Sequence, residues 1–148
     1  MPDIRHRVGI TAPADQVFDA VATRDGLTGW WTTDVSGGTR PGDELEFRFG
    51  GPDAAARMEV LEVVDPSLVR WRCVDGPDDW RNTTLSFEIE PDGDQTAVLF
   101  THADWREPSP FLHHCSTKWA QFLLGMKSGL EGGEATPWPT DEPIDSWG

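Results

Sequence analysis

The stretch "SPFLHHCSTKWAQFLLGMKSGLEGG", residues 109–133, contains the most clearly marked secondary-structure element of the chain. Ser109 is a residue type that caps helices, and Pro110 suits the first helical position. The pair Gly132-Gly133 is typical of a helix end. We therefore predict a helix over residues 110–131. About 22 residues at 1.5 Å each give a rod of roughly 33 Å, which can cross a whole sheet.

One side of this helix is apolar. The apolar stripe spans an arc of about 100° and consists of Leu112, Cys115, Trp119, Phe122, Leu123, Met126 and Leu130. Gly125 and Gly129 flank the stripe, either because the backbone comes close to a sheet there or because a ligand needs the room. The rest of the chain must cover this face.

The run His113-His114-Cys115 has the residue types of a metal or catalytic centre but the wrong spacing. Successive helical residues point about 100° apart, so three adjacent side chains cannot converge on one ion. Helical metal sites place two histidines four residues apart, and that spacing is absent here. We predict that both histidines are solvated, that Cys115 is a core residue and that the chain holds no metal.

Upstream of this helix the hydrophobic pattern changes to the period of two that marks strands. Alternation over residues 4–10 predicts a first strand, and two helical segments follow, one beginning at Pro13 and one over residues 24–31. Five further strand segments carry Leu45, Phe47 and Phe49; Met58 and Val60; Val69, Trp71 and Cys73; Leu85, Phe87 and Ile89; and Val98, Phe100 and His102. A change of phase after Val60 predicts a bulge or a strand covered on both faces.

The connections between these segments predict the fold class. "DPS", "DGPDD" and "PDGD" are turn sequences, so consecutive strands should be antiparallel neighbours. We predict an α+β fold in which a curved antiparallel sheet wraps around the long C-terminal helix, as one domain over residues 1–148. The extended tail over residues 134–148 should hold Trp138 against the surface, whereas Trp147 is either tucked in or frayed.

A sheet that grips a helix often encloses a cavity between the two. The side chains predicted to line such a pocket are Trp31, Phe47, Phe49, Met58, Trp71, Phe87, Phe100, His102, Trp119, Phe122 and Met126. Aromatic residues and Met make an adaptable apolar lining, although the same set also describes an ordinary packed core. His6 and His102 share the inward phase, where an imidazole acts as an acid or base, orients a ligand, or serves as a hydrogen-bonded structural residue.

Composition excludes several classes of partner. Acidic residues outnumber basic ones by 26 to 12, and the net charge of −14 repels a phosphate backbone, so we expect no nucleic acid. No run is long enough to span a membrane and the N-terminus lacks an apolar signal segment. Cys73 and Cys115 lack paired spacing, which predicts reduced thiols in a cytoplasmic protein. We find no nucleophile elbow, phosphate loop or cofactor motif, and therefore assign no catalytic residue and no cofactor.

Four ordered segments resemble a known superfamily. They are "ITAPADQVFDAVATRDGLTGWW", "GGTRPGDELEFRFG", "TTLSFEIEPDGDQTAVLFTHADW" and "CSTKWAQFLLGMKSGLEGGEATPWP". Together they resemble the SRPBCC superfamily, which has the START-like, birch-pollen-allergen-like helix-grip fold. Within it the chain is similar to the branch named for the activator of the ninety-kilodalton heat-shock-protein ATPase. The resemblance implies the element order β-α-α-β6-α and a cavity that takes hydrophobic small molecules.

The residues and the resemblance lead to three hypotheses. The first is a non-enzymatic protein that binds a small hydrophobic or amphipathic molecule between the sheet and the 110–131 helix. The second is a cyclase-like or hydrolase-like enzyme that uses His102 or His6 as its acid–base. The third is a co-chaperone type of protein-interaction module. A homodimer or a chaperone contact stays open, since no residue pattern argues for either.

Overall fold

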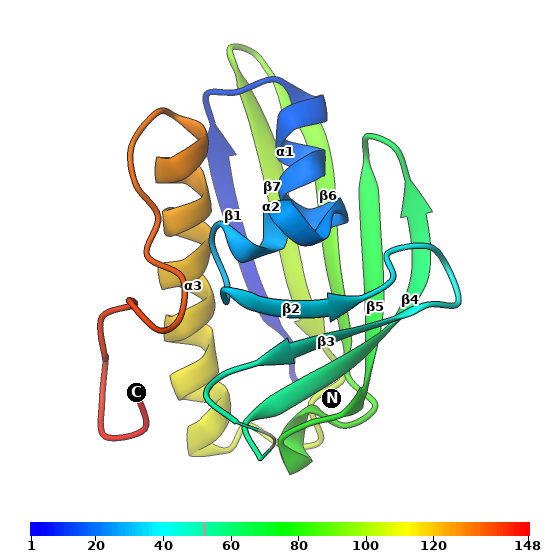
Figure 1. Cartoon of the computed structure of the whole chain (residues 1–148), viewed down its shortest axis with the longest axis vertical. Coiled ribbons are helices and arrows are strands. Elements are labelled where there is room, and N and C mark those ends of the chain that lie inside the picture. Colours follow the sequence, from blue (N-terminus) through cyan, green and yellow to red (C-terminus); the bar gives the residue numbers. More distant parts are fainter. Residues whose placement is uncertain (52) are drawn as a thin grey trace.

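A seven-stranded antiparallel sheet curves around one long helix, which confirms the predicted α+β helix-grip class (Figure 1). The computed structural model describes residues 1–51 and 53–148. The elements in chain order are β1 (Ile4–Ile10), α1 (Ala14–Ala22), α2 (Arg24–Thr28), β2 (Asp34–Gly37), β3 (Glu44–Arg48), β4 (Ala55–Val64), β5 (Leu68–Asp75), the 3-10 helix η1 (Asp78–Trp80), β6 (Thr84–Asp92), β7 (Gln95–Ala103) and α3 (Pro110–Leu130).

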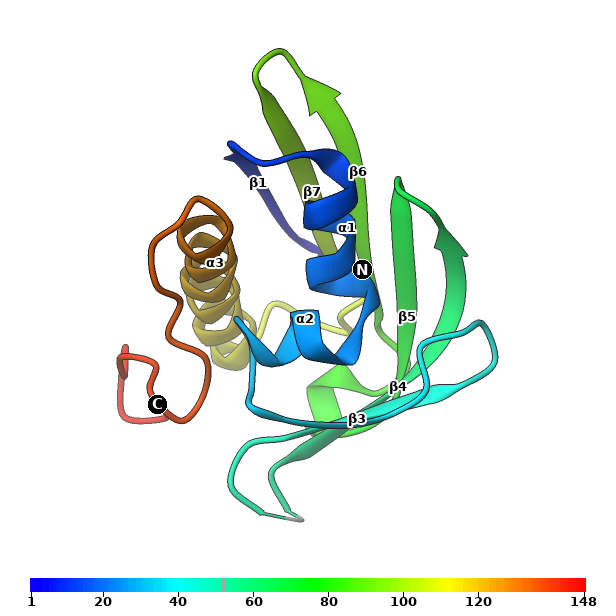
Figure 2. The same cartoon turned by 45° about the horizontal axis from the view of Figure 1, so that its top comes forward.

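The strand order is β1-β7-β6-β5-β4-β3-β2, so every strand after β2 pairs with its predecessor in the chain. This order confirms the antiparallel neighbours that the short turns predicted. Figure 2 shows α3 on the concave side of the sheet, with α1 and α2 beside it. The curvature gives the apolar stripe of α3 a surface to pack against. Among the described residues, no helix is long and apolar enough to cross a membrane.

The structure explains the change of phase in β4. The pairing of β4 with β5 shifts register between Val60 and Glu62, which confirms a bulge. The extra residue leaves Leu61 on the outer face, where 40% of it is exposed. A bulge increases the local twist of a strand, and here it helps the sheet to curve.

Strand β2 carries no signal in the sequence. Its four residues, "DVSG", include one apolar side chain, and Val35 is only half-buried. Four residues contain only two repeats of the period-two pattern, which is too few to identify a strand from the sequence. The strand forms because it pairs with β3. The residues therefore predicted five strands after the helices, and only the resemblance implied the sixth.

Helix α3 forms where it was predicted, but its start differs in detail. Ser109 occupies the N-cap position, yet its hydroxyl donates to Asp79 Oδ2 (3.0 Å) and makes no capping hydrogen bond. The bond ties the start of α3 to η1, more than 25 residues earlier in the chain. The predicted apolar stripe is confirmed, since its central five members from Cys115 to Met126 are buried.

Two predictions about α3 were wrong because the tail packs against this helix. His113 is exposed as expected, but His114 is only 10% exposed, because its ring stacks on Phe111 and its Nδ1 donates to Asp145 Oδ2 (2.7 Å). A periodic pattern marks the core face of a helix but not a face that a tail covers. The glycines of α3 also approach the tail rather than the sheet: a Cβ at Gly125 or at Gly129 would meet Ala135.

Candidate functional site

The predicted pocket residues fall into two groups. Seven are packed in the interior or lie away from the main cavity, and these are Phe47, Met58, Trp71, Phe87, Phe100, His102 and Met126. Four line that cavity: Trp31, Phe49, Trp119 and Phe122. Met126 instead borders a second, shallower hollow between α3 and the α1–α2 pair. The structure thus distinguishes residues of the filled core from residues of the cavity wall, whereas the sequence analysis placed both in one set.

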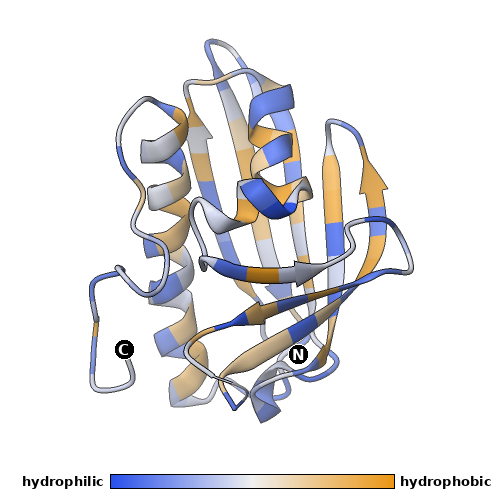
Figure 3. Cartoon of the chain, viewed as in Figure 1, coloured by the Kyte–Doolittle hydropathy of each residue, from blue (hydrophilic) through white to orange (hydrophobic). Residues whose placement is uncertain are grey.

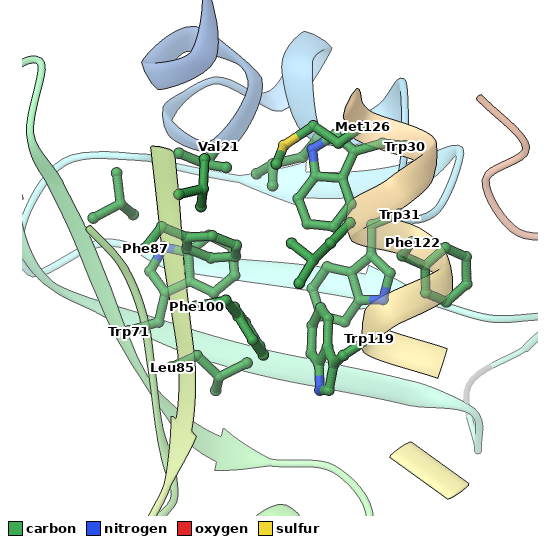
Figure 4. Close-up of a cluster of buried hydrophobic side chains, with 14 of the residues drawn as sticks. Val21, Trp30, Trp31, Trp71, Leu85, Phe87, Phe100, Trp119, Phe122 and Met126 are labelled. Carbon is green, nitrogen blue, oxygen red and sulfur yellow. The ribbon is translucent and has the colours of Figure 1, made fainter. Parts of the chain in front are cut away.

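Aromatic rings fill the middle of the space between sheet and helix (Figure 4). Trp31 lies 4.3 Å from Phe47 and stacks parallel to Trp71 at 6.3 Å, measured between ring centroids. Phe100 lies 4.5 Å from Trp119 on α3. These separations are those of rings in contact, so no guest fits between them.

The main cavity, of about 760 Å³, opens where α3 begins. Binding sites for small molecules commonly measure about 300–1,000 Å³. Four parts of the chain form its wall: the end of β3 and the start of β4, the segment from Asp75 to Arg81, the first half of α3, and the tail. The cavity therefore lies at one end of the sheet–helix interface rather than along its whole length.

Three tryptophans form an aromatic surface in this cavity. Trp119 lies 4.8 Å from Trp31 and 6.1 Å from Trp80, and Trp31 lies 6.4 Å from Trp80. The ring planes of Trp80 and Trp119 differ by 19°, so they offer nearly parallel faces. Trp80 belongs to η1, in a segment read only as a turn, and that is why the sequence analysis missed it.

His102 does not face the cavity, because it lies fully buried behind Trp119. Trp119 Nε1–H donates to His102 Nδ1 (3.2 Å), which leaves Nε2–H of the imidazole to donate to Thr83 Oγ1 (2.8 Å). The Thr83 hydroxyl in turn donates to the Trp80 carbonyl (2.5 Å). Burial lowers the pKa of His102 to about 3, so the ring is neutral.

This network gives His102 a positioning role. Both ring nitrogens are engaged, so no lone pair is free to accept a proton from a substrate. The bonds fix the indole of Trp119 and the backbone at Trp80, two of the three tryptophans that form the aromatic surface. His6, by contrast, is half-buried and donates from Nε2 to the Ser116 carbonyl (3.0 Å), tying β1 to α3.

The cavity also contains a buried thiol. Burial raises the pKa of Cys115 to about 12, so it stays protonated at neutral pH. Cys73 lies outside the lining, and burial raises its pKa to about 11. The indole N–H of Trp80 faces the Cys115 thiol and has no oxygen or nitrogen partner within the described part of the chain.

The rim of the cavity carries paired charges. Arg81 and Arg57 approach the same carboxylate, that of Asp75, at 3.2 Å and 3.9 Å. On α3, Lys118 contacts Asp141 of the tail (2.5 Å) and lies over the Phe122 ring. Across residues 1–51 and 53–148, no group of histidine, cysteine or carboxylate side chains could hold a metal ion. The site combines an aromatic wall with a polar rim, an arrangement suited to binding.

Comparison with known proteins agrees with the fold. The family model described as Activator of Hsp90 ATPase homolog 1-like protein matches residues 11–131. A search of curated protein sequences finds no match.

Solved structures with this fold include one close in sequence. The Aha1 dimer from Colwellia psychrerythraea is 40% identical, with a TM-score of 0.81, over 90% of this chain and 98% of that one. Protein SSP2350 from Staphylococcus saprophyticus is 21% identical (TM-score 0.76; 92% and 97% covered). CalU16 from Micromonospora echinospora is 19% identical (TM-score 0.74; 90% and 76% covered), and these two show the fold alone. The chain belongs to the family of Activator of Hsp90 ATPase homolog 1-like proteins, within the SRPBCC superfamily.

Proposed function

We propose that this protein binds a small hydrophobic or amphipathic molecule in the cavity at the start of α3. The observation that carries the proposal is a cavity of about 760 Å³ whose lining includes Trp31, Trp80 and Trp119. Burying about 250 Å² of apolar ligand surface at about 25 cal/mol per Å² contributes roughly 6 kcal/mol, before the entropy of association is subtracted. Even without that subtraction, roughly 6 kcal/mol corresponds to a Kd of about 40 μM, so we expect binding no tighter than tens of micromolar.

The rim favours a ligand with a polar end. Arg57, Arg81 and Lys118 offer N–H donors, and each already faces a carboxylate. A ligand oxygen at the rim would add to these networks, while the ring system of the ligand lies on the indoles. A planar, partly aromatic molecule with one or two oxygen substituents fits both surfaces.

Binding is tested with Nile red, a neutral polycyclic probe. We expect its fluorescence to rise on titration with the protein, tryptophan fluorescence to fall, and the melting temperature to increase with probe concentration. The variant Ala56→Phe adds bulk on the buried, cavity-lining face of β4 and should weaken binding. Leu61→Phe, on the exposed face of the same strand, should bind as the wild type does.

A second variant guards against loss of the fold. Phe122→Ala removes a wall residue instead of filling the space, and its secondary structure is checked by circular dichroism. Equal probe affinity in the wild type, Ala56→Phe and Phe122→Ala would place the probe elsewhere and refute binding in this cavity.

We also propose that two copies of the chain associate. The support is the relative from Colwellia psychrerythraea, 40% identical over nearly its whole length, which is described as a dimer. Light scattering after size exclusion should give twice the 16.4 kDa mass of one chain. A mass of one chain at concentrations up to the millimolar range would exclude a stable dimer.

A further inference from the structure

The tail forms one wall of the cavity although it lies beyond the residues that the family model matches. The family match ends at residue 131, yet Trp138, Asp141 and Trp147 all border the cavity. Figures 1 and 2 show the tail running back along α3 toward the start of that helix. This chain therefore completes its cavity with residues that lie beyond the end of the family match.

The near part of the tail is fixed by its backbone. Trp138 N–H donates to the Trp31 carbonyl (2.9 Å), and the Trp138 carbonyl accepts from Thr33 N–H (3.2 Å). Its ring also meets the edge of Phe49, with centroids 6.3 Å apart. Backbone bonds on both sides, together with a ring contact, hold this point to the body of the protein.

The far part, residues 141–148, is held in another way. Its backbone hydrogen bonds are internal, from Ile144 to Gly148 and from Gly148 to Asp145, and within the described ranges no backbone pair joins it to the rest of the fold. Its contacts are made by α3 side chains. Lys118 binds Asp141 (2.5 Å) and also donates to the carbonyls of Glu142 and Gly148 (3.3 Å each). His114 binds Asp145 (2.7 Å), and Gln121 Nε2 donates to the Glu142 carbonyl (2.8 Å).

Little apolar burial adds to these contacts. Trp147 packs on Phe111 and His114 with centroids 6.1 Å and 5.6 Å apart, but 59% of it remains exposed. In Figure 3 the tail is drawn mainly in the blue and white of polar residues. Segments with few buried apolar contacts open locally at much lower free energy than a core does.

Two of the three anchoring side chains of α3 are also cavity residues. His114 and Lys118 are one turn apart, at i and i+4, so they lie on the same face of α3. Both border the cavity, as do Asp141 and Trp147 of the tail. The same contacts that hold the tail in place therefore close one side of the cavity.

We propose that residues 141–148 form a strap, latched to α3 through His114, Lys118 and Gln121, whose release governs entry to and exit from the cavity. Trp138 is its fixed end. This inference rests on the proposed function, since a gate needs a ligand to pass through it.

The test measures Nile red exchange by stopped-flow fluorescence. The double variant Asp141→Asn/Asp145→Asn removes both latch charges with little change in size. Because the side chains of Lys118 and Asp141 are only 12% and 11% exposed, removing the charge of one partner weakens a largely buried contact. We therefore expect association and dissociation rate constants both to rise by at least about fivefold, with a smaller change in Kd. Glu62→Gln, which breaks the exposed Arg70–Glu62 pair on the sheet, is the matched control and should exchange as the wild type does.

A second measurement follows the strap itself. With 5-fluorotryptophan incorporated, the Trp147 resonance is assigned by Trp147→Phe, and in the double variant it should move toward the position of free tryptophan. An unchanged resonance, unchanged rates, or a faster dissociation with an unchanged association rate would overturn the gate. If the double variant bound the probe and the wild type did not, that result would also support the gate. Failure of every variant to bind the probe would instead refute the proposed function, and the gate with it.

Discussion

His102 shows how a residue with catalytic chemistry can serve structure. Its alternation with neighbouring strand residues places it in the interior, and the structure confirms that it is fully buried. Its neutral ring accepts from Trp119 and donates to Thr83, so its two nitrogens join α3 to the segment before β6. The sequence indicates the direction of the side chain but not these partners, because Thr83 lies in a turn without periodicity.

The first prediction concerns the pH dependence of stability. Burial lowers the folded pKa of His102 to about 3 from an ordinary 6.5. Between these values the unfolded chain binds a proton that the folded chain does not, so the free energy of unfolding should fall as pH decreases from 6.5 toward 3. Across the whole window this contribution is roughly 5 kcal/mol. Urea titrations at several pH values measure it.

The control separates His102 from the carboxylates, which titrate in an overlapping range. His102→Asn lacks the titrating ring, and its stability should depend less on pH from 6.5 to 4 than that of the wild type. His113→Gln changes an exposed histidine and should leave the slope as it is. Equal slopes in all three proteins would mean that His102 takes up its proton without unfolding.

The second prediction, at the level of the polar network, is that Thr83→Val loosens the cavity wall. The substitution keeps the shape but removes the hydroxyl that joins His102 to the Trp80 carbonyl. A buried donor left without a partner costs about 1–3 kcal/mol. Chemical denaturation should show this loss, and Nile red affinity should fall as Trp80 and Trp119 lose their fixed positions. Unchanged stability would show that another group satisfies the imidazole.

Among the elements, helix α3 was the easiest to predict and its surroundings were the hardest. Its apolar stripe follows from residue spacing alone, and five members are buried. The space near Gly125 and Gly129 is filled by Ala135 of the tail, which no periodicity places there. Strand β2 could not be predicted for a similar reason. It has only four residues, and it forms because it pairs with β3 rather than because of its own hydrophobic pattern.

The third prediction compares two helical glycines. At Gly125 a Cβ would lie 3.8 Å from the Ala135 Cβ, an ordinary contact, so Gly125→Ala should raise the free energy of unfolding by about 1 kcal/mol through helix propensity. At Gly26 a Cβ would come within 2.7 Å of the Ala20 Cα, where α2 crosses α1. Gly26→Ala should therefore destabilise the protein by roughly 2 kcal/mol.

Thermal and urea denaturation of both variants check the sign of each effect. The comparison is matched, since each variant adds one methyl group to a helix. A loss of stability in Gly125→Ala would mean that the tail packs on α3 more tightly than the 3.8 Å separation implies.

On the scale of the whole molecule, the sequence predicted which side chains face inward but not where empty space remains. Periodicity assigns residues to a face and says nothing about which of them touch. Here the rings of Trp31, Phe47 and Trp71 contact each other and fill the centre. The main cavity lies at the start of α3, where part of its wall comes from the turn between Asp75 and Arg81 and from the tail, both without periodic signals.

The fourth prediction follows from the net charge of −14. The negative field should repel an anionic ligand, and salt screens that repulsion over a distance of about 10 Å at 0.1 M. Raising the sodium chloride concentration should therefore strengthen the binding of the anionic probe anilinonaphthalene sulfonate by a few-fold, while Nile red, which is neutral, controls for the effect of salt on apolar burial. Fluorescence titrations at low and high salt measure both. If salt weakened the anionic probe instead, the local field of Arg57, Arg81 and Lys118 would outweigh that of the whole protein, and anions would be the favoured ligands.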